Sequence, residues 1–122
     1  MMTITELKDL LLAAIAAYFP AAKVESTERR TTILQVRVTI DEKTFADIYF
    51  NVLTGKKSYA LVFHRQRVMG YDNYRFWHHH PFDDPAVHIP CEEPSTEDVI
   101  AEMKSVVDKL IELRREVGGD QL

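Results

Sequence analysis

The chain has 122 residues, of which 46% are hydrophobic and 28% are charged, and its net charge is −4 at pH 7. This length and composition are typical of one globular domain with its own core, so we expect residues 1–122 to form a single domain. No apolar run approaches the roughly 20 residues of a membrane span, and no basic segment precedes the first apolar stretch as in a secretory signal. Cys91 is the single cysteine, which excludes an internal disulfide. The sequence therefore predicts a cytoplasmic protein without a membrane segment.

A first helix is predicted over residues 4–18. Thr3 and Glu6 have the spacing of a capping box, in which each satisfies a backbone N–H of the other. The apolar positions of this segment fall on one helical face: Ile4, Leu7, Leu11, Ala14, Ile15 and Tyr18. Pro20 ends the helix, and the polar residues 21–30 are expected to be a linker that runs into a frayed strand.

Four strands are predicted after this linker. Residues 34–40 alternate apolar and polar side chains, as in a strand with one wet face. Residues 44–53 have apolar side chains on both parities, as in a central strand, and residues 58–64 and 68–71 give a third and a weaker fourth strand. Short turns at 41–43 and at 54–56, where Gly55 can take a positive φ, imply an antiparallel meander.

A long helix is predicted near the C-terminus. Ser95 can cap it, and a stripe of apolar residues follows: Val99, Met103, Val106, Leu110, Leu113 and Val117, widened by Ile100, Val107 and Ile111. Gly118 and Gly119 are expected to end it. The stripe fits packing across the sheet, and its spacing also fits a coiled-coil seam of a homodimer. The predicted class is α+β: an N-terminal helix, a four-stranded antiparallel meander and a long C-terminal helix packed on the sheet.

The charges are distributed unevenly along the chain. Residues 54–80 contain five basic residues and one acidic residue, whereas residues 92–122 contain nine acidic and four basic residues. A local basic face can attract a phosphate or an acidic partner, although the acidic balance of the whole chain disfavours a broad nucleic-acid surface. Alternatively, the basic and acidic segments form complementary solvent-exposed faces of one fold and bind no partner.

The segment from Tyr74 to Pro94 is expected to be an irregular loop, because it contains four prolines. Loops of this length in compact domains are often functional. The segment and the residues just before it are dense in reactive groups: Asp72, Asn73, Tyr74, Arg75, His78, His79, His80, Asp83, Asp84 and His88. Three interpretations compete for them.

The first interpretation is a metal site in a metal-dependent hydrolase. His78 and His80 share one face of an extended segment, and His88 or His64 would supply a third nitrogen. Asp72 or Asp83 would supply an oxygen. Neutral imidazoles suit zinc, nickel or copper, so a zinc or nickel ion held by His78, His80 and His88 is one hypothesis.

The second interpretation is metal-free cleavage of RNA, in which a histidine pair acts as base and acid. Such a reaction needs a cation near the phosphate, and Arg65, Arg67 and Arg75 are the candidates. Phe76 and Trp77 can stack on a base. The third interpretation is structural: the histidines bond backbone carbonyls, and the aromatic residues pin the loop to the sheet.

A family resemblance adds to these interpretations. The triplet Tyr71-Asp72-Asn73 ends a Tyr-rich hairpin, and Phe76-Trp77-His78-His79-His80 and a helix with an acidic cap follow it. This arrangement resembles the TumE-like family, the toxins of type II toxin–antitoxin modules, over about residues 58–113. The chain departs from the family pattern at Met69-Gly70, where a basic residue is expected, at Trp77, which replaces a proline, and at Tyr74-Arg75, which replaces a histidine pair.

The resemblance implies a small α+β toxin that acts on RNA or on the ribosome, and an antitoxin protein encoded beside it. It carries Asp72, Asn73, His78, His79 and His80 over as functional residues. The resulting hypothesis is a ribonuclease with Asp72, Asn73, His78 and His80 as catalytic residues and Arg65, Arg67, Arg75 and Trp77 as substrate-binding residues. A noncatalytic interaction module that dimerises through its last helix is the alternative from a different class.

Overall fold

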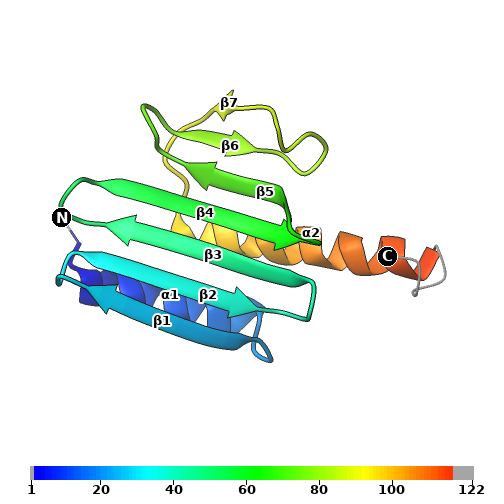
Figure 1. Cartoon of the computed structure of the whole chain (residues 1–122), viewed down its shortest axis with the longest axis horizontal. Helices are drawn as coiled ribbons and strands as arrows, with labels where there is room; N and C mark the ends of the chain where they lie inside the picture. The colour runs from blue at the N-terminus through cyan, green and yellow to red at the C-terminus, as the bar shows by residue number, and fades with distance from the viewer. Residues whose placement is uncertain (1, 117–122) are drawn as a thin grey trace.

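The computed structural model of the protein describes residues 2–116 (Figure 1). The elements are α1 (Ile4–Tyr18), β1 (Lys23–Arg29), β2 (Ile33–Thr39), β3 (Thr44–Asn51), β4 (Lys56–Phe63), β5 (Gln66–Asp72), β6 (His78–His80), β7 (Ile89–Pro90) and α2 (Thr96–Glu116). The strands form one sheet in the order β1-β2-β3-β4-β5-β6-β7, and each strand is antiparallel to its neighbours. The predicted α+β class and the antiparallel meander are confirmed. Within residues 2–116, neither helix has the length and apolar character needed to cross a membrane.

The prediction of four strands is wrong, because the sheet has seven. The additional strands are β1, β6 and β7. All seven residues of β1 are exposed, so no apolar alternation marks it, and main-chain pairing with β2 makes it the edge of the sheet. β6 and β7 have three and two residues and lie inside the segment that was expected to be an irregular loop.

Helix α1 begins and ends where the sequence predicts. The backbone N–H of Glu6 donates to Thr3 Oγ1 at 3.2 Å, and the N–H of Thr3 donates to Glu6 Oε1 at 3.1 Å, which is the expected capping box. The apolar stripe of the helix is buried at Ile4, Leu7, Leu11, Ala14 and Ile15. This face packs on β2 and on α2.

Helix α2 uses its apolar stripe inside the domain. Ser95 Oγ accepts a hydrogen bond from the N–H of Asp98 at 3.0 Å, as expected of the cap. Six residues of the stripe are buried: Val99, Ile100, Met103, Val106, Val107 and Leu110. Ile111 and Leu113 are exposed, whereas the predicted positions Val117, Gly118 and Gly119 lie outside the described residues. The expected packing of this helix within the domain is confirmed.

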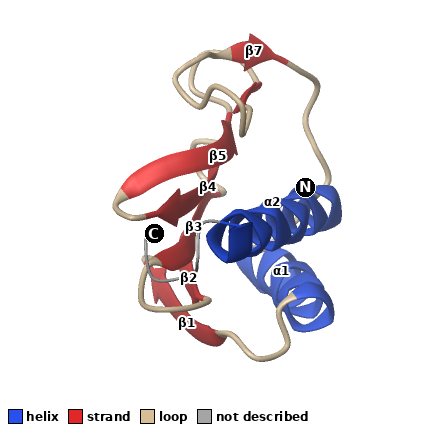
Figure 2. Ribbon diagram, turned by 90° about the vertical axis from the view of Figure 1, so that its right-hand side faces the viewer, coloured by secondary structure: helices blue, strands red, loops and turns tan. Residues whose placement is uncertain are grey.

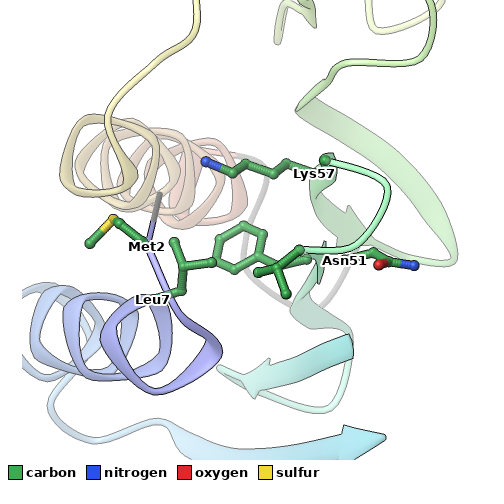
Figure 3. Close-up of a pocket in the computed structure, with 7 residues that line it drawn as sticks. Met2, Leu7, Asn51 and Lys57 are labelled. Atoms are coloured by element: carbon green, nitrogen blue, oxygen red, sulfur yellow. The ribbon is translucent and has the colours of Figure 1, made fainter. Parts of the chain in front are cut away.

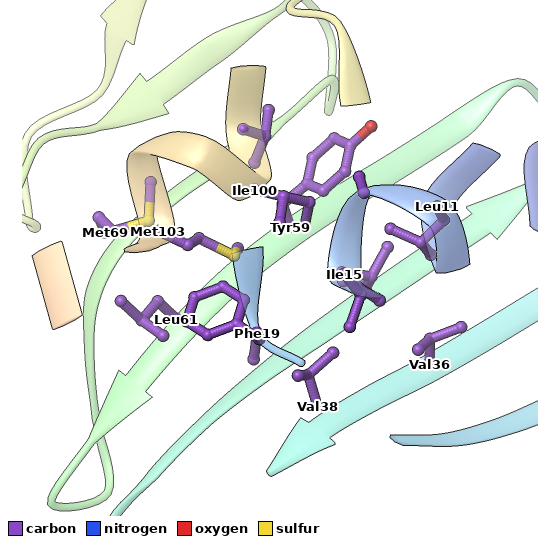
Figure 4. Close-up of a cluster of buried hydrophobic side chains, with 14 of the residues drawn as sticks. Leu11, Ile15, Phe19, Val36, Val38, Tyr59, Leu61, Met69, Ile100 and Met103 are labelled. Atoms are coloured by element: carbon purple, nitrogen blue, oxygen red, sulfur yellow. The ribbon is translucent and has the colours of Figure 1, made fainter. Parts of the chain in front are cut away.

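Both helices lie on the same face of the sheet, and Figure 2 shows them side by side there. The core between the helices and the sheet contains Phe50 from β3, Leu61 from β4, Met69 from β5 and Met103 from α2 (Figure 4). Burying each of these large side chains stabilises the fold by about 1.5–3 kcal/mol. Alternate residues of the strands point to the other face, which carries no helix, and we call this side of the sheet the open face.

Candidate functional site

The candidate site lies on the open face, where β5 and β6 pair. His78 is paired with Asp72, and His80 is paired with Gly70. Because directly paired residues share a face, both histidines point to the side of Asp72. His79 is paired with Tyr71 and faces the helices, and its ring stacks on the Tyr71 ring with centroids 5.5 Å apart. The sheet register thus places His78 and His80 on the open face and His79 on the face that carries the helices.

The carboxylate of Asp72 faces the imidazoles of His78 and His80. Its Oδ1 lies 3.2 Å from Nε2 of His78, and its Oδ2 lies 3.5 Å from Nε2 of His80. The exposed fraction of the side chain is 4% for His78 and 1% for His80, against 21% for Asp72. Neither close contact has the direction of a hydrogen bond, and within residues 2–116 neither Nε2 has another hydrogen-bond partner. Two buried ring nitrogens therefore converge on one carboxylate without being satisfied.

The other ring nitrogen of His78 defines its tautomer. Nδ1 of His78 lies 3.0 Å from the backbone carbonyl oxygen of Phe76. Since a carbonyl oxygen accepts hydrogen bonds and does not donate them, Nδ1 carries the proton in this bond. In the neutral ring, Nε2 then presents its lone pair to Asp72.

His80 has a similar backbone partner and also a cationic neighbour. Its Nδ1 lies 3.1 Å from the carbonyl oxygen of Pro85 and 3.2 Å from a guanidinium nitrogen of Arg67. Arg67 also reaches the Pro85 oxygen, at 3.5 Å, so with the proton on Nδ1 that oxygen accepts from both side chains. Burial and the charge of Arg67 lower the pKa of His80, and they outweigh the opposite effect of Asp72.

His88 is the third histidine of the cluster. It is the last residue of the segment 81–88, which folds over the open face. Its ring centroid is 4.7 Å from that of His78 and 4.4 Å from that of His80. One ring nitrogen from each of the three histidines lies within 4.8 Å of the others. His64 is in the tight turn between β4 and β5, and within residues 2–116 neither it nor Asp83 belongs to this group. The sequence offered His88 or His64 as the third ligand, and His88 is the one that joins the cluster.

A cavity of about 230 Å³ opens beside the cluster. It is lined by Asp72, Tyr74, Arg75, Phe76, His78 and His88. Tyr74 and Phe76 are exposed at 64% and 52%, and the Arg75 guanidinium lies over the Tyr74 ring at 5.5 Å from the centroid. Solvent and small polar molecules can therefore approach Asp72 from a rim that carries a cation and two aromatic rings.

Asn73 holds this site in place and does not face the cavity. Its Oδ1 accepts from the N–H of Lys57 at 2.8 Å, and its Nδ2 donates to the carbonyl of Gly55 at 2.8 Å. Both ends of the amide are thus used to fasten the end of β5 to the β3–β4 turn. Asn73, which was expected to be catalytic, is a positioning residue in this arrangement.

Two of the expected substrate-binding residues lie elsewhere. Arg65 is in the β4–β5 turn, seven residues before Asp72 along β5, which corresponds to roughly 20 Å of extended chain. Trp77 is partly buried against the core, and the exposed aromatic residues near the cluster are Tyr74 and Phe76. Arg67 contacts His80, and Arg75 lines the cavity. The contact of Pro85 with His80 and Arg67 has no signature in the sequence, because it is made by the backbone carbonyl.

A second cavity of about 230 Å³ lies between the start of α1 and the β3–β4 turn (Figure 3). Its lining is mainly apolar, from Met2, Leu7, Phe50 and Val52. Lys57 contributes a charge there, but its ammonium pairs with Glu93 at 2.8 Å. This cavity lacks the converging polar groups found beside Asp72.

Comparisons with protein families, with curated proteins and with solved structures find no match for the chain. The functional conclusions below therefore rest on the residues of the site and on the resemblance noted in the sequence.

Proposed function

We propose that the protein is the toxin of a type II toxin–antitoxin module, and that it acts in the cytoplasm on RNA or translation through the cluster of Asp72, His78 and His80. The observation that carries this proposal is the convergence of these three residues. They also carry the resemblance to TumE-like toxins, and they meet on one face of the sheet although five residues separate Asp72 from His78. An antitoxin protein would be the natural partner of such a chain.

The surroundings of the cluster support a phosphodiester as the bond that is attacked. Arg75 lines the cavity beside Asp72, and a guanidinium binds phosphate oxygens through directed hydrogen bonds. Tyr74 and Phe76 offer exposed rings on which the bases of a single strand can stack. Hydrolysis of RNA within a single-stranded region is therefore the activity that we assign to this site.

The interaction module is the second candidate. Ile111 and Leu113 support it, because they expose apolar surface at 38% and 46% at the end of α2. A homodimer or a complex through this end of the helix would bury that surface. The module needs no contribution from Asp72, and this separates the two candidates experimentally.

The ribonuclease activity can be tested with purified protein and a labelled single-stranded RNA. We expect cleavage by the wild-type protein and a rate about 10²–10⁴-fold lower for Asp72→Asn, because the variant keeps the shape of the side chain and removes its charge. Asp47→Asn is the matched control: Asp47 also lies on the open face, where it pairs with Arg37 at 2.8 Å. Equal cleavage by wild type and Asp72→Asn would show that the cluster is not the source of the activity.

A further inference from the structure

We propose that Asp72, His78, His80 and His88 form a binding site for one divalent first-row transition-metal ion. The role of this ion as a cofactor rests on the proposed function, because the ion would bind to the same side chains. Metal binding itself is a property of the purified protein and is measured without reference to toxicity.

The first argument is the convergence of two buried, unpartnered ring nitrogens on one carboxylate. Nε2 of His78 and Nε2 of His80 are buried, and both face the Asp72 carboxylate at 3.2 and 3.5 Å. Two buried ring nitrogens without a hydrogen-bond partner therefore meet a negative charge at this point of the open face. Unsatisfied buried groups of this kind cost free energy, and a bound cation removes the cost.

The spacing of these atoms matches a coordination sphere. Zinc binds imidazole nitrogen and carboxylate oxygen at about 2.0–2.2 Å, so two ligand atoms of a tetrahedral site lie roughly 3.3 Å apart. Oδ1 of Asp72 lies 3.2 Å from Nε2 of His78, and Oδ2 lies 3.5 Å from Nε2 of His80, so each carboxylate oxygen is near that distance from one ring nitrogen. The nitrogens of the three histidines are more loosely spaced, within 4.8 Å of one another, and His88 is the exposed member of the group.

The contacts of the Nδ1 atoms, on the side of each ring away from Asp72, resemble those of metal-binding histidines. A ligating histidine commonly donates its other N–H to a backbone carbonyl or a carboxylate, which fixes the ring and its tautomer. His78 does so to the carbonyl of Phe76 at 3.0 Å, and Nδ1 of His80 lies 3.1 Å from the carbonyl oxygen of Pro85 and 3.2 Å from a guanidinium nitrogen of Arg67. The N–H of Tyr74 donates to Asp72 Oδ1 at 3.0 Å, which orients the carboxylate.

Direct proton transfer by these rings is less compatible with the same contacts. A general base must reach the proton of the substrate with a free nitrogen. In His78 and His80, Nδ1 lies at a backbone carbonyl and Nε2 is buried against Asp72, so neither ring has a solvent-exposed nitrogen free for a substrate proton. A metal ion held between them can act on a substrate that the rings cannot touch.

The donor set selects the class of metal. Three imidazoles and one carboxylate favour zinc, nickel, copper or iron(II) over magnesium and calcium, which prefer oxygen ligands. His88 lines the cavity together with Asp72 and His78, so this side of the site is the one open to solvent. A site with one exposed ligand beside a cavity is more typical of a functional centre than of a closed structural one.

Metal uptake tests the inference. Protein freed of metal with a chelator is mixed with zinc, desalted and analysed for zinc and protein; we expect about one zinc ion per chain and no retention of magnesium. Cobalt(II), added as a spectroscopic probe, should give the visible absorption of a four- or five-coordinate nitrogen and oxygen site. His78→Ala, His80→Ala and His88→Ala should each weaken zinc binding at least about 10-fold.

His79→Ala is the matched control, because His79 lies in the same strand but faces Tyr71 on the other side of the sheet. It should bind zinc as the wild type does. If circular dichroism shows that His78→Ala or His80→Ala is unfolded, the test rests on zinc binding by His88→Ala. His88 is exposed, so its side chain can be removed without unfolding the protein. Wild-type protein without bound zinc, or unchanged binding by folded His88→Ala and His78→Ala, would overturn the proposal. Zinc binding without toxicity would remove the proposed function and leave the metal site in place.

Discussion

Expression of the chain in a bacterial host is expected to arrest growth, and the single change Asp72→Asn is expected to restore it. The carboxylate contacts both buried histidines, so its loss removes a charged group from the site and lowers the rate of the reaction by about 10²–10⁴-fold. Growth curves and viable counts after induction measure the effect. Replacing His78 or His80 by Gln should act in the same direction.

The design of these variants follows from the burial of the histidines. From the sequence, His78 and His80 were expected to lie in an irregular loop. The rings are buried instead, so an alanine leaves a cavity and reduces the free energy of unfolding as well. Asn and Gln keep most of the volume, and circular dichroism of each purified variant shows whether the fold is retained.

His79→Gln is the control for the growth experiment, and it should remain toxic. An interaction module predicts a different pattern, in which surface changes on the basic segment from Lys56 to Arg75 matter more than any one histidine, and their effect weakens with salt. Toxicity that persists in Asp72→Asn, His78→Gln and His80→Gln would contradict the catalytic account. A chain that never inhibits growth would favour the interaction module.

The largest effect on stability is expected for Leu110→Ala. Leu110 is 8% exposed on the face of α2 that packs into the core, and a buried Leu→Ala change costs about 2–4 kcal/mol because the cavity only partly collapses. Chemical denaturation followed by circular dichroism gives the free energy of unfolding. The midpoint should move to clearly lower denaturant concentration with little change in slope.

Leu113→Ala is the matched control on the same helix. Leu113 is 46% exposed, so its truncation should change the free energy of unfolding by less than about 0.5 kcal/mol. Equal midpoints for the two variants would show that the two positions are equally buried in solution. A loss at Leu113 alone would indicate that the end of α2 is covered by a partner, as in a homodimer.

Elements with a clear pattern of side chains could be predicted from the sequence. The capping residues and the stripe of α1 gave its bounds, and the alternation in β2 and the apolar run of β3 gave the centre of the sheet. The edge strand β1 could not be recognised as part of the sheet, because its polar side chains carry no information about its main-chain pairing. The same holds for β6 and β7, whose few residues are held by the neighbouring strand.

The site was predictable in its residue types and less so in their roles. The alternation of an extended chain correctly placed His78 and His80 on one face, and the side of Asp72 followed from the same register. The role of Asn73 depends on the β3–β4 turn, which lies sixteen or more residues away in the chain, and could not be inferred locally. The carbonyls of Phe76 and Pro85, which fix the tautomers, have no signature in the sequence.

The central claim is that Asp72, His78, His80 and His88 hold a metal ion in the proposed functional site. Diffraction data from crystals grown with zinc, collected above and below the zinc absorption edge, test it most directly. The account predicts one anomalous peak about 2.0–2.2 Å from Nε2 of His78, from Nε2 of His80 and from an oxygen of Asp72. The absence of a peak at this position, with both Nε2 atoms bonded to water or to the carboxylate, would contradict it.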